Sequence, residues 1–358
     1  MPVTSCSWCW LATISLAGGV AFAVNEKQIH GNDDRIEVYE ETDATILALS
    51  RSVCALVADE NCQDNSDGTH MLVPFEFTFT DGFGFPVFFC EDEPFLDQPS
   101  VAFCTGFLVA PDVIATAGHC VEEGDITGIR VVFGWEMLDA ETPASVVPNE
   151  QVYYVTEVVD AVSQYLSLPL LVDRLRLRVR DYAVLRLDRP VTVPGAAPLP
   201  LRTFGHVPSG ALLGIIGHPM GLPKKIAFNA TTRPRDNLHP DFFFTNLDNL
   251  GGNSGSPVFN RQTGVVEGIA IFDNVSSLWT LEDGCVRPLR VPEGEARSGV
   301  LRSAMLSHLT AGGRIMPKLL PVCGGQASPE SNAADILVAG VAAVLLLGHL
   351  LGKRCRAS

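Results

Sequence analysis

Three short strings of this chain carry side chains that can act together in acyl transfer. They surround His119, Asp181 and Ser254, which lie far apart in the sequence. A serine hydroxyl is a poor nucleophile near neutral pH unless an adjacent imidazole accepts its proton. The imidazole in turn needs a buried carboxylate that fixes its tautomer and stabilises its charged form. These residue types therefore indicate hydrolysis by an activated serine.

The serine lies in the string Gly-Gly-Asn-Ser-Gly-Ser-Pro at residues 251–257. Two glycines before Ser254 allow a sharp turn in which backbone amides converge on a developing oxyanion. The amides of Gly252 and Ser254 are the expected donors. The apolar residues after Pro257 predict a strand, which would hold the nucleophile on a rigid element.

The histidine follows a predicted hairpin. Residues 103–109 and 113–117 have the apolar pattern of two strands, and Ala-Pro-Asp between them predicts a turn. A lone histidine is more often a satisfied core or surface residue than a base. His119, however, is bracketed by Cys104 and Cys120, which the hairpin would bring together, and this makes it a sharper candidate. We expect these cysteines to form a disulfide.

In this order the strings resemble those of the trypsin-like serine peptidases of the chymotrypsin fold. They are most similar to the bacterial branch that includes the glutamyl endopeptidases, in which Gly-Asn-Ser-Gly-Ser-Pro replaces the Gly-Asp-Ser-Gly-Gly-Pro of the animal digestive enzymes. The resemblance covers about residues 45–311. It implies that His119 is the general base, Asp181 the orienting acid and Ser254 the nucleophile. It also implies that Gly252 supplies the second oxyanion amide, and it supports the disulfide.

Asp181 is the residue whose role depends most on context. It precedes the apolar run at 182–185, so its carboxylate would be desolvated unless His119 paired with it. The structural alternative is an aspartate that only blunts the edge of a sheet. Three rival acids are not followed by such a run: Asp160, Asp173 and Asp188.

The residue before the nucleophile is Asn253. By resemblance, the digestive enzymes have an aspartate there that pairs with a new amino terminus created by cleavage. A neutral side chain cannot form that ion pair. We therefore expect the oxyanion loop to be ordered without release of Ile29 or a similar terminus.

Six residues before the nucleophile lies Asp248. By resemblance it lines the base of the primary specificity pocket, where a buried carboxylate selects Arg or Lys. The glutamyl endopeptidases instead have a histidine on the strand after the nucleophile, and this chain has Ala270 there. The sequence thus predicts an Arg/Lys preference, with Glu specificity as the alternative. The non-functional alternative is that Asp248 is a solvated turn residue.

Alternating apolar segments with frequent Gly and Pro predict an all-β protein. The resemblance implies two six-stranded antiparallel β-barrels of the chymotrypsin type. The peptidase domain is expected at 44–325, with barrel one at about 44–190, barrel two at about 200–311, and a Pro-rich connector at 189–200. The predicted strands are 46–49, 75–80, 103–109, 113–117, 129–133, 152–159, 182–187, 211–217, 225–228, 242–246, 257–260 and 265–272. Residues 299–309 are expected to form a closing helix.

Both ends of the chain are apolar. A run ending in Ala-Phe-Ala predicts a signal peptide at 1–23, followed by an N-terminal extension or propeptide at 24–43. A linker at 326–334 precedes an apolar transmembrane or sorting helix at 335–352 and a basic cytoplasmic tail at 353–358. We expect an exported protein that contacts a membrane through the C-terminal helix only.

The charge and the cysteines narrow the choice of partners. The chain has 25 basic and 41 acidic residues, and this acidic excess argues against nucleic acid as a partner. Alternating arginines from Arg174 to Arg180 are read as a solvated strand face. No zinc-peptidase motif occurs, and we expect neither a metal nor a cofactor. Ten cysteines fit an oxidising compartment, and proximity makes Cys54–Cys62 a candidate second disulfide.

Two functional classes fit these observations. The first is an exported serine endopeptidase that acts on polypeptides through an acyl-enzyme, and the second is a non-catalytic binding domain that kept the fold. The presence of all three triad residue types and of the oxyanion glycines favours the first.

Overall fold

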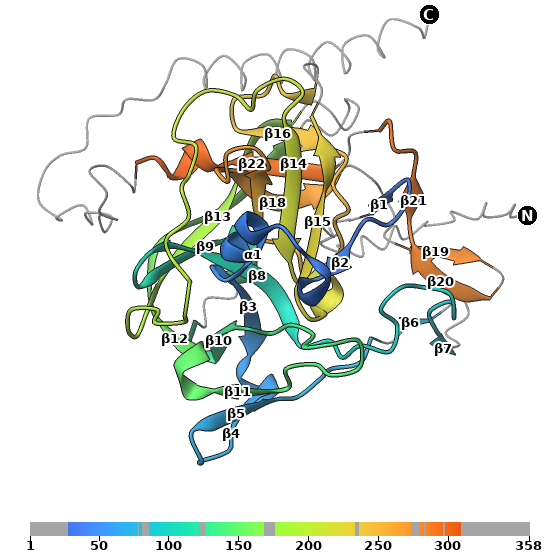
Figure 1. Cartoon of the computed structure of the whole chain (residues 1–358). Helices are drawn as coiled ribbons and strands as arrows, with labels where there is room; N and C mark the ends of the chain where they lie inside the picture. The colour runs from blue at the N-terminus through green and yellow to red at the C-terminus, as the bar shows by residue number, and fades with distance from the viewer. Residues whose placement is uncertain are drawn as a thin grey trace, which may run out of the picture. The chain divides into compact units, whose positions relative to one another are not determined.

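The computed structural model in Figure 1 describes residues 28–308 apart from 78, 81–85, 122–125, 168–175, 233–235, 274–278, 283 and 296–297. The expected signal peptide (1–23), linker (326–334), apolar helix (335–352) and basic tail (353–358) lie outside these residues. Within them, no helix has the length and apolar character needed to cross a bilayer.

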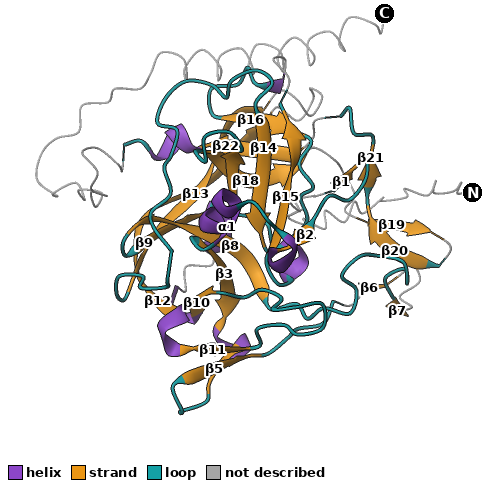
Figure 2. Cartoon of the chain, in the orientation of Figure 1, coloured by secondary structure: helices purple, strands orange, loops and turns teal. Residues whose placement is uncertain are grey.

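Strands dominate the described residues, and Figure 2 shows helical structure only in short pieces between them. Six strands form a closed barrel in the order β10-β12-β13-β9-β8-β3. The strands are β3 (Val53–Ala58), β8 (Ala102–Ala110), β9 (Val113–Thr116), β10 (Ile129–Phe133), β12 (Val152–Ser167) and β13 (Arg176–Leu187). The all-β class and one six-stranded barrel are therefore present.

The second half of the fold differs from the closed barrel that was expected. It is a seven-stranded sheet in the order β16-β22-β18-β17-β14-β15-β2. The strands are β2 (Ile36–Glu37), β14 (Leu212–Gly217), β15 (Lys225–Thr231), β16 (Phe242–Thr245), β17 (Pro257–Asn260), β18 (Val266–Asp273) and β22 (Ser298–Arg302).

Side chains join β15 to β16 where the backbone ladder does not. The Thr245 hydroxyl donates to the Thr231 carbonyl at 2.8 Å, and the Thr232 hydroxyl donates to the Phe244 carbonyl at 2.7 Å. The sheet therefore curls round without a seventh ladder of backbone bonds.

Smaller sheets and turns surround these two halves. The smaller strands are β1 (Ile29–His30), β4 (Cys62–Asp64), β5 (Thr69–Leu72), β6 (Phe79–Thr80), β7 (Pro86–Val87), β11 (Val146–Pro148), β19 (Trp279–Glu282), β20 (Cys285–Pro288) and β21 (Arg290–Val291). The 3-10 turns are η1 (Val38–Glu40), η2 (Asp59–Asn61), η3 (Gly118–Val121), η4 (Ile126–Gly128), η5 (Asn149–Gln151), η6 (Pro219–Gly221) and η8 (Ser303–Leu306).

Three sequence-based assignments of secondary structure were wrong. Of the strand expected at 75–80, the described residues form only β6 at its end and an isolated bridge between Phe75 and Ser100. The strand expected at 46–49 is part of helix α1 (Ala44–Ser50), because the Asp43 side chain caps it by accepting from the Thr45 amide at 2.8 Å and its residues are mostly good helix formers. The helix expected at 299–309 is instead β22 followed by η8, since β22 pairs with strands on both sides.

The N-terminal segment is also built into the fold. Residues 28–37, expected as part of an extension or propeptide, include β1 and β2, and Gln28, Ile29 and His30 are almost fully buried. β1 pairs with β21, and β2 pairs with β15 (Figure 1). We call residues 28–37 the strap.

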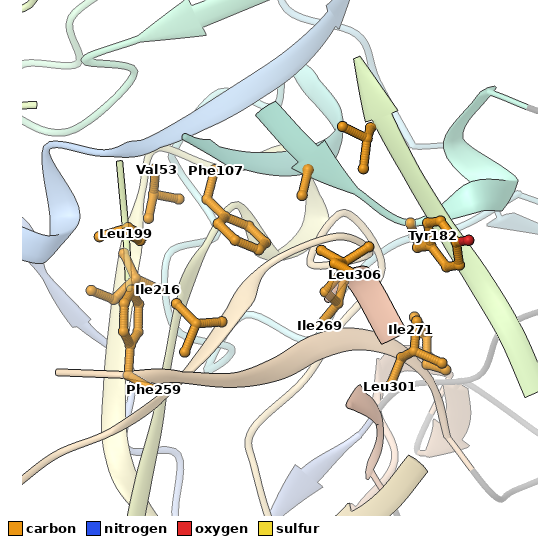
Figure 3. Packing of buried hydrophobic residues seen from close by; sticks show 14 of the residues in the cluster. Val53, Phe107, Tyr182, Leu199, Ile216, Phe259, Ile269, Ile271, Leu301 and Leu306 are labelled. Atoms are coloured by element: carbon orange, nitrogen blue, oxygen red, sulfur yellow. The ribbon is translucent and has the colours of Figure 1, made fainter. Parts of the chain in front are cut away.

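The largest hydrophobic cluster lies between the barrel and the sheet (Figure 3). Phe107 and Tyr182 reach it from the barrel, and Phe259 and Ile269 reach it from the sheet. Alternation explains how one strand serves two cores: in β13, Tyr182 and Val184 face this cluster, whereas the odd-numbered residues from 183 to 187 face the barrel interior. Burial here fixes one half against the other.

One of the two expected disulfides is present, and the other is replaced by a different pair. Cys104 and Cys120 form the expected disulfide, and a second one joins Cys90 to Cys285. The candidate pair Cys54–Cys62 is wrong. Both thiols are reduced and buried, and they lie in two different hydrophobic clusters. Burial raises the pKa of Cys54 to about 12.

The packing of the central cluster leads to a testable prediction about stability. Phe107 is fully buried in it, so Phe107→Ala should lower the free energy of unfolding by about 3–5 kcal/mol through lost burial and a residual cavity. Phe204→Ala is the matched control, because Phe204 is 81% exposed and its loss should cost less than about 0.5 kcal/mol. Equal losses in denaturant unfolding of the two variants would contradict this assignment of the core.

Candidate active site

His119 is placed by the end of β9 and the short turn η3. The Cys104–Cys120 disulfide ties this turn back to β8. Gly118 precedes the histidine at a point where a side chain has no room, because a Cβ there would lie 2.1 Å from the Val162 carbonyl oxygen and 3.0 Å from Asp181 Oδ1. The close approach of η3 to β12 and β13 thus requires glycine.

Asp181 lies within β13 rather than at its start, where the sequence placed it. The strand begins at Arg176, and Asp181 pairs in register with Ser163 of β12. Its side chain is fully buried. One carboxylate oxygen, Oδ1, accepts the backbone amide of His119 at 2.8 Å. This bond fixes the carboxylate and the turn to each other.

The structure brings the three predicted residues together. His119 Nδ1 lies 2.7 Å from Asp181 Oδ2, and His119 Nε2 lies 2.8 Å from Ser254 Oγ. Since an ionised carboxylate only accepts, Nδ1 carries the proton and donates it to Asp181. Nε2 then presents its lone pair to Ser254, whose hydroxyl donates to it. This is the geometry and tautomer that a general base requires.

Three carbonyl groups in the loop just before Ser254 are each held by a donor. The Gly251 carbonyl accepts from the Met220 amide, the Gly252 carbonyl from the Thr105 hydroxyl at 2.9 Å, and the Asn253 carbonyl from the Ser256 amide at 2.9 Å. In a trans peptide the C=O and the next N–H point in opposite directions. Fixing these carbonyls therefore fixes the directions of the Gly252 and Ser254 amides.

Gly252 is a position in this loop that no other residue fits. Its φ is +85°, and a Cβ there would lie 2.3 Å from the His218 carbonyl oxygen. Both the left-handed backbone and the contact with η6 exclude a side chain. The glycine noted in the sequence is thus a geometric requirement of the loop.

Thr105 is a site residue that the sequence reasoning missed. Its amide donates to the Ser254 carbonyl at 2.8 Å, and its hydroxyl links the His218 amide at 3.0 Å to the Gly252 carbonyl. It lies on β8, one residue after Cys104, so its only sequence signal was its place in the predicted hairpin. His218, which sequence reasoning treated as a loop-shaping residue, is buried in this junction. Burial lowers the pKa of its imidazole well below the usual value.

Asp248 does not have the surroundings expected of a residue that faces substrate. It is 3% exposed, and its two oxygens accept the backbone amides of His30 at 2.7 Å and Asp34 at 2.9 Å. Both donors belong to the strap. The carboxylate is therefore directed at the N-terminal segment, and it is not the solvated turn residue of the alternative reading either. Burial and the nearby Asp34 carboxyl raise its pKa to about 8.

Metal binding gains no support from this geometry. Among the described residues, one group of metal-ligand types comes together, namely Cys104, His119 and Cys120. Its two sulfurs are bonded to each other, so they are not thiolate ligands. The His119 nitrogens are engaged by Asp181 and Ser254.

Comparison with known proteins agrees with this site. Residues 104–269, which contain all three side chains, match the family model of the trypsin-like peptidase domain. The resemblance to trypsin-like peptidases inferred from the motifs is thus confirmed. A comparison with curated proteins found no relative.

Similar solved structures include human heparin binding protein, with 20% sequence identity and a TM-score of 0.41 over 63% of this chain and 90% of that one. They also include a Glu endopeptidase, with 16% identity and a TM-score of 0.40 over 78% of this chain and 95% of that one.

The requirement for glycine at 118 can be tested by adding one methyl group. Gly118→Ala should lower the free energy of unfolding by about 1–3 kcal/mol, because the new Cβ meets the Val162 backbone. Gly128→Ala is the matched control, since a Cβ at 128 meets no atom within 4 Å. The expectation fails if chemical denaturation gives the two variants the same stability.

Proposed function

We propose that this chain, which carries a match to the trypsin-like peptidase domain, is a serine endopeptidase that cleaves polypeptides through an acyl-enzyme. The observation that carries the proposal is the line of hydrogen bonds from Asp181 through His119 to Ser254. A binding domain has no need of a buried carboxylate, a fixed histidine tautomer and a serine hydroxyl bonded to that histidine acting together.

The proposed reaction begins when Ser254 Oγ attacks the carbonyl carbon of the scissile peptide bond. His119 Nε2 takes the hydroxyl proton, and the carbonyl oxygen becomes an oxyanion. The tetrahedral intermediate collapses as His119 returns that proton to the leaving amine and the C–N bond breaks. Water then attacks the acyl-Ser254 ester by the same route, which releases the acid and restores the serine.

Asp181 supports this cycle without taking up the proton. Its carboxylate holds the Nδ1 proton of His119 and stabilises the imidazolium that forms during attack. The amides of Gly252 and Ser254 are the proposed oxyanion donors, because the carbonyls before them are fixed by Met220 and by Ser256. Preorganised donors need no rearrangement as the charge develops, and one of them is worth about 100- to 1000-fold in rate.

The Arg/Lys preference expected from Asp248 is not part of the proposal. A carboxyl group that is 3% exposed and is bonded to two strap amides is not open to a substrate cation. Glu specificity gains no support either, since Ala270 provides no charged or hydrogen-bonding side chain at the position expected for histidine. Its carbonyl accepts from the Gly255 amide at 2.8 Å. The side chain recognised by the primary pocket is thus set by other groups.

We also propose that the domain works outside the cytoplasm. Two disulfides, one of which closes the turn that carries His119, are stable in an oxidising compartment. The expected N-terminal signal peptide would deliver the chain there, and the apolar segment at 335–352 would anchor or sort it.

A fluorophosphonate probe tests the proposal because it labels only an activated serine. The wild-type protein should be labelled on Ser254, and Ser254→Ala should lose all labelling while keeping its unfolding transition. Asp181→Asn should be labelled about 10⁴-fold more slowly, because the wrong His119 tautomer is favoured.

The second functional class gives the opposite result in the same assay. A folded wild-type protein that the probe does not label would indicate a non-catalytic binding domain. Labelling that persists in Ser254→Ala would place the reactive residue elsewhere.

A further inference from the structure

We propose that Asp248 is a positioning residue that fastens the strap to the loop carrying the nucleophile, and that its partnership with Asp34 makes this attachment depend on pH. The role in catalysis rests on the proposed peptidase function. The attachment itself rests only on the contacts of the strap.

The strap is bonded to the loop at successive residues. The Asn249 amide donates to the Gln28 carbonyl at 3.0 Å, and His30 Nδ1 lies 2.9 Å from the Leu247 carbonyl, to which it donates. Asp248 lies between these two contacts and accepts the His30 and Asp34 amides. Residues 247–249 are thus held by the strap along their whole length.

The strap is in turn held by other parts of the domain. The Ile29 and Gly31 amides donate to the carbonyls of Leu289 and Val291, beside β21 and within it, at 3.0 and 2.8 Å. At its other end, Glu37 forms a buried ion pair with Lys225 at 3.0 Å. Because the strap is fixed on both sides, bonds to Asp248 transmit that position to the loop.

The loop needs such support because Asn253 offers no ion pair. Asn253 Oδ1 makes only a long contact, 3.4 Å, with the Ser256 hydroxyl among the bonds seen here. The stretch from Leu247 to Gly252 contains no strand of the seven-stranded sheet. Asp248 is six residues from the nucleophile and is the acidic side chain that ties this stretch to a neighbouring segment.

Two carboxyl groups meet at this attachment. Asp34 lies beside Asp248, and its Oδ2 also accepts the Asn229 amide at 3.1 Å. An ionised carboxylate is costly to bury beside a second carboxyl group, so the protonated form of Asp248 is favoured. Burial first, and the Asp34 carboxyl second, raise the pKa of Asp248 to about 8.

The cations nearby are bonded to groups other than Asp248. Arg35 and Lys225 line the same small cavity as Asp248. The Arg35 guanidinium is engaged by both oxygens of Asp33, at 2.8 and 2.5 Å. The Lys225 ammonium is bonded to Glu37, Gln98 and the Pro223 carbonyl. His30, the other titratable group of the strap at this point, donates to Leu247 rather than to a carboxylate.

The sign of the pH effect follows from the raised pKa. Between about pH 4, where an unfolded Asp248 ionises, and about pH 8, the folded protein holds a proton that the unfolded chain has lost. Stability from this group is complete below that window and is lost as the pH rises through it. Above about pH 8 Asp248 is ionised beside a second carboxyl group, and the strap holds the loop less firmly.

The test compares Asp34→Asn with wild type in two independent assays. In thermal unfolding, wild type should lose several degrees of Tm between pH 5 and pH 8 that Asp34→Asn does not lose, because the side-chain amide introduced at position 34 can donate to an ionised Asp248. The exposed Asp97→Asn is the matched control, since it removes the same charge elsewhere and should follow wild type. Identical pH dependence in wild type and Asp34→Asn would overturn the pH-dependent attachment.

The second assay measures fluorophosphonate labelling between pH 7 and pH 10. The labelling rate of wild type should fall about tenfold or more above pH 8, and the labelling rate of Asp34→Asn should not fall. Burial also lowers the pKa of Lys225 to about 8, so Lys225 could cause a loss of labelling in the same pH range. Lys225 is present in both proteins. A decline in labelling that wild type and Asp34→Asn share would therefore be caused by Lys225 and would contradict the proposal.

Substitution of Asp248 separates positioning from substrate binding. Asp248→Ala should lower kcat about tenfold or more with little change in KM, equally for peptides with Arg, Glu or a neutral residue before the scissile bond. Asp248→Asn should recover part of that loss because it still accepts one amide. A loss confined to Arg and Lys peptides would show a pocket residue and overturn the inference.

Failure of the peptidase proposal can be told apart from failure of the strap attachment. If wild type is never labelled, the peptidase proposal fails, while the Tm comparison still decides whether the acid pair attaches the strap.

Discussion

Thr105 makes three hydrogen bonds across the junction between the barrel and the sheet, and the position of Ser254 relative to His119 depends on them. Its amide holds the Ser254 carbonyl, and its hydroxyl lies between the His218 amide and the Gly252 carbonyl. His119 and Asp181 belong to the barrel side, whereas Ser254 belongs to the sheet side. The proposed nucleophile and its base lie on different halves and need such a link, because a displacement of about 1 Å can cost 100-fold in rate.

The loop that carries Ser254 is supported from two directions. On one side η6 and Thr105 fix its carbonyl groups, and on the other the strap fixes residues 247–249 through Asp248 and Asn249. Asn253, which offers no charge, is therefore compatible with an ordered loop. The segment that looked like a removable extension contributes the buried residues Gln28, Ile29 and His30 to this support.

The sequence was most informative where a residue must be of one type. Gly252, with φ at +85°, and the strand residues of β10 and β17 were identified from local pattern alone. The sequence was least informative where long-range contacts decide. β3 is an unbroken apolar run without alternation and was missed, and the Cys90–Cys285 disulfide joins residues 195 positions apart. The burial of Asp248 against the strap belongs to the same class, since no local pattern records which segment will pack on a carboxylate.

The central claim is that His119 makes Ser254 a nucleophile that forms an acyl-enzyme. The most direct measurement is a pre-steady-state experiment with a p-nitrophenyl ester. A burst of nitrophenol close to one equivalent per folded protein, absent in Ser254→Ala, is the result the account predicts. Release of nitrophenol with no burst and at the same rate in Ser254→Ala and wild type would contradict it.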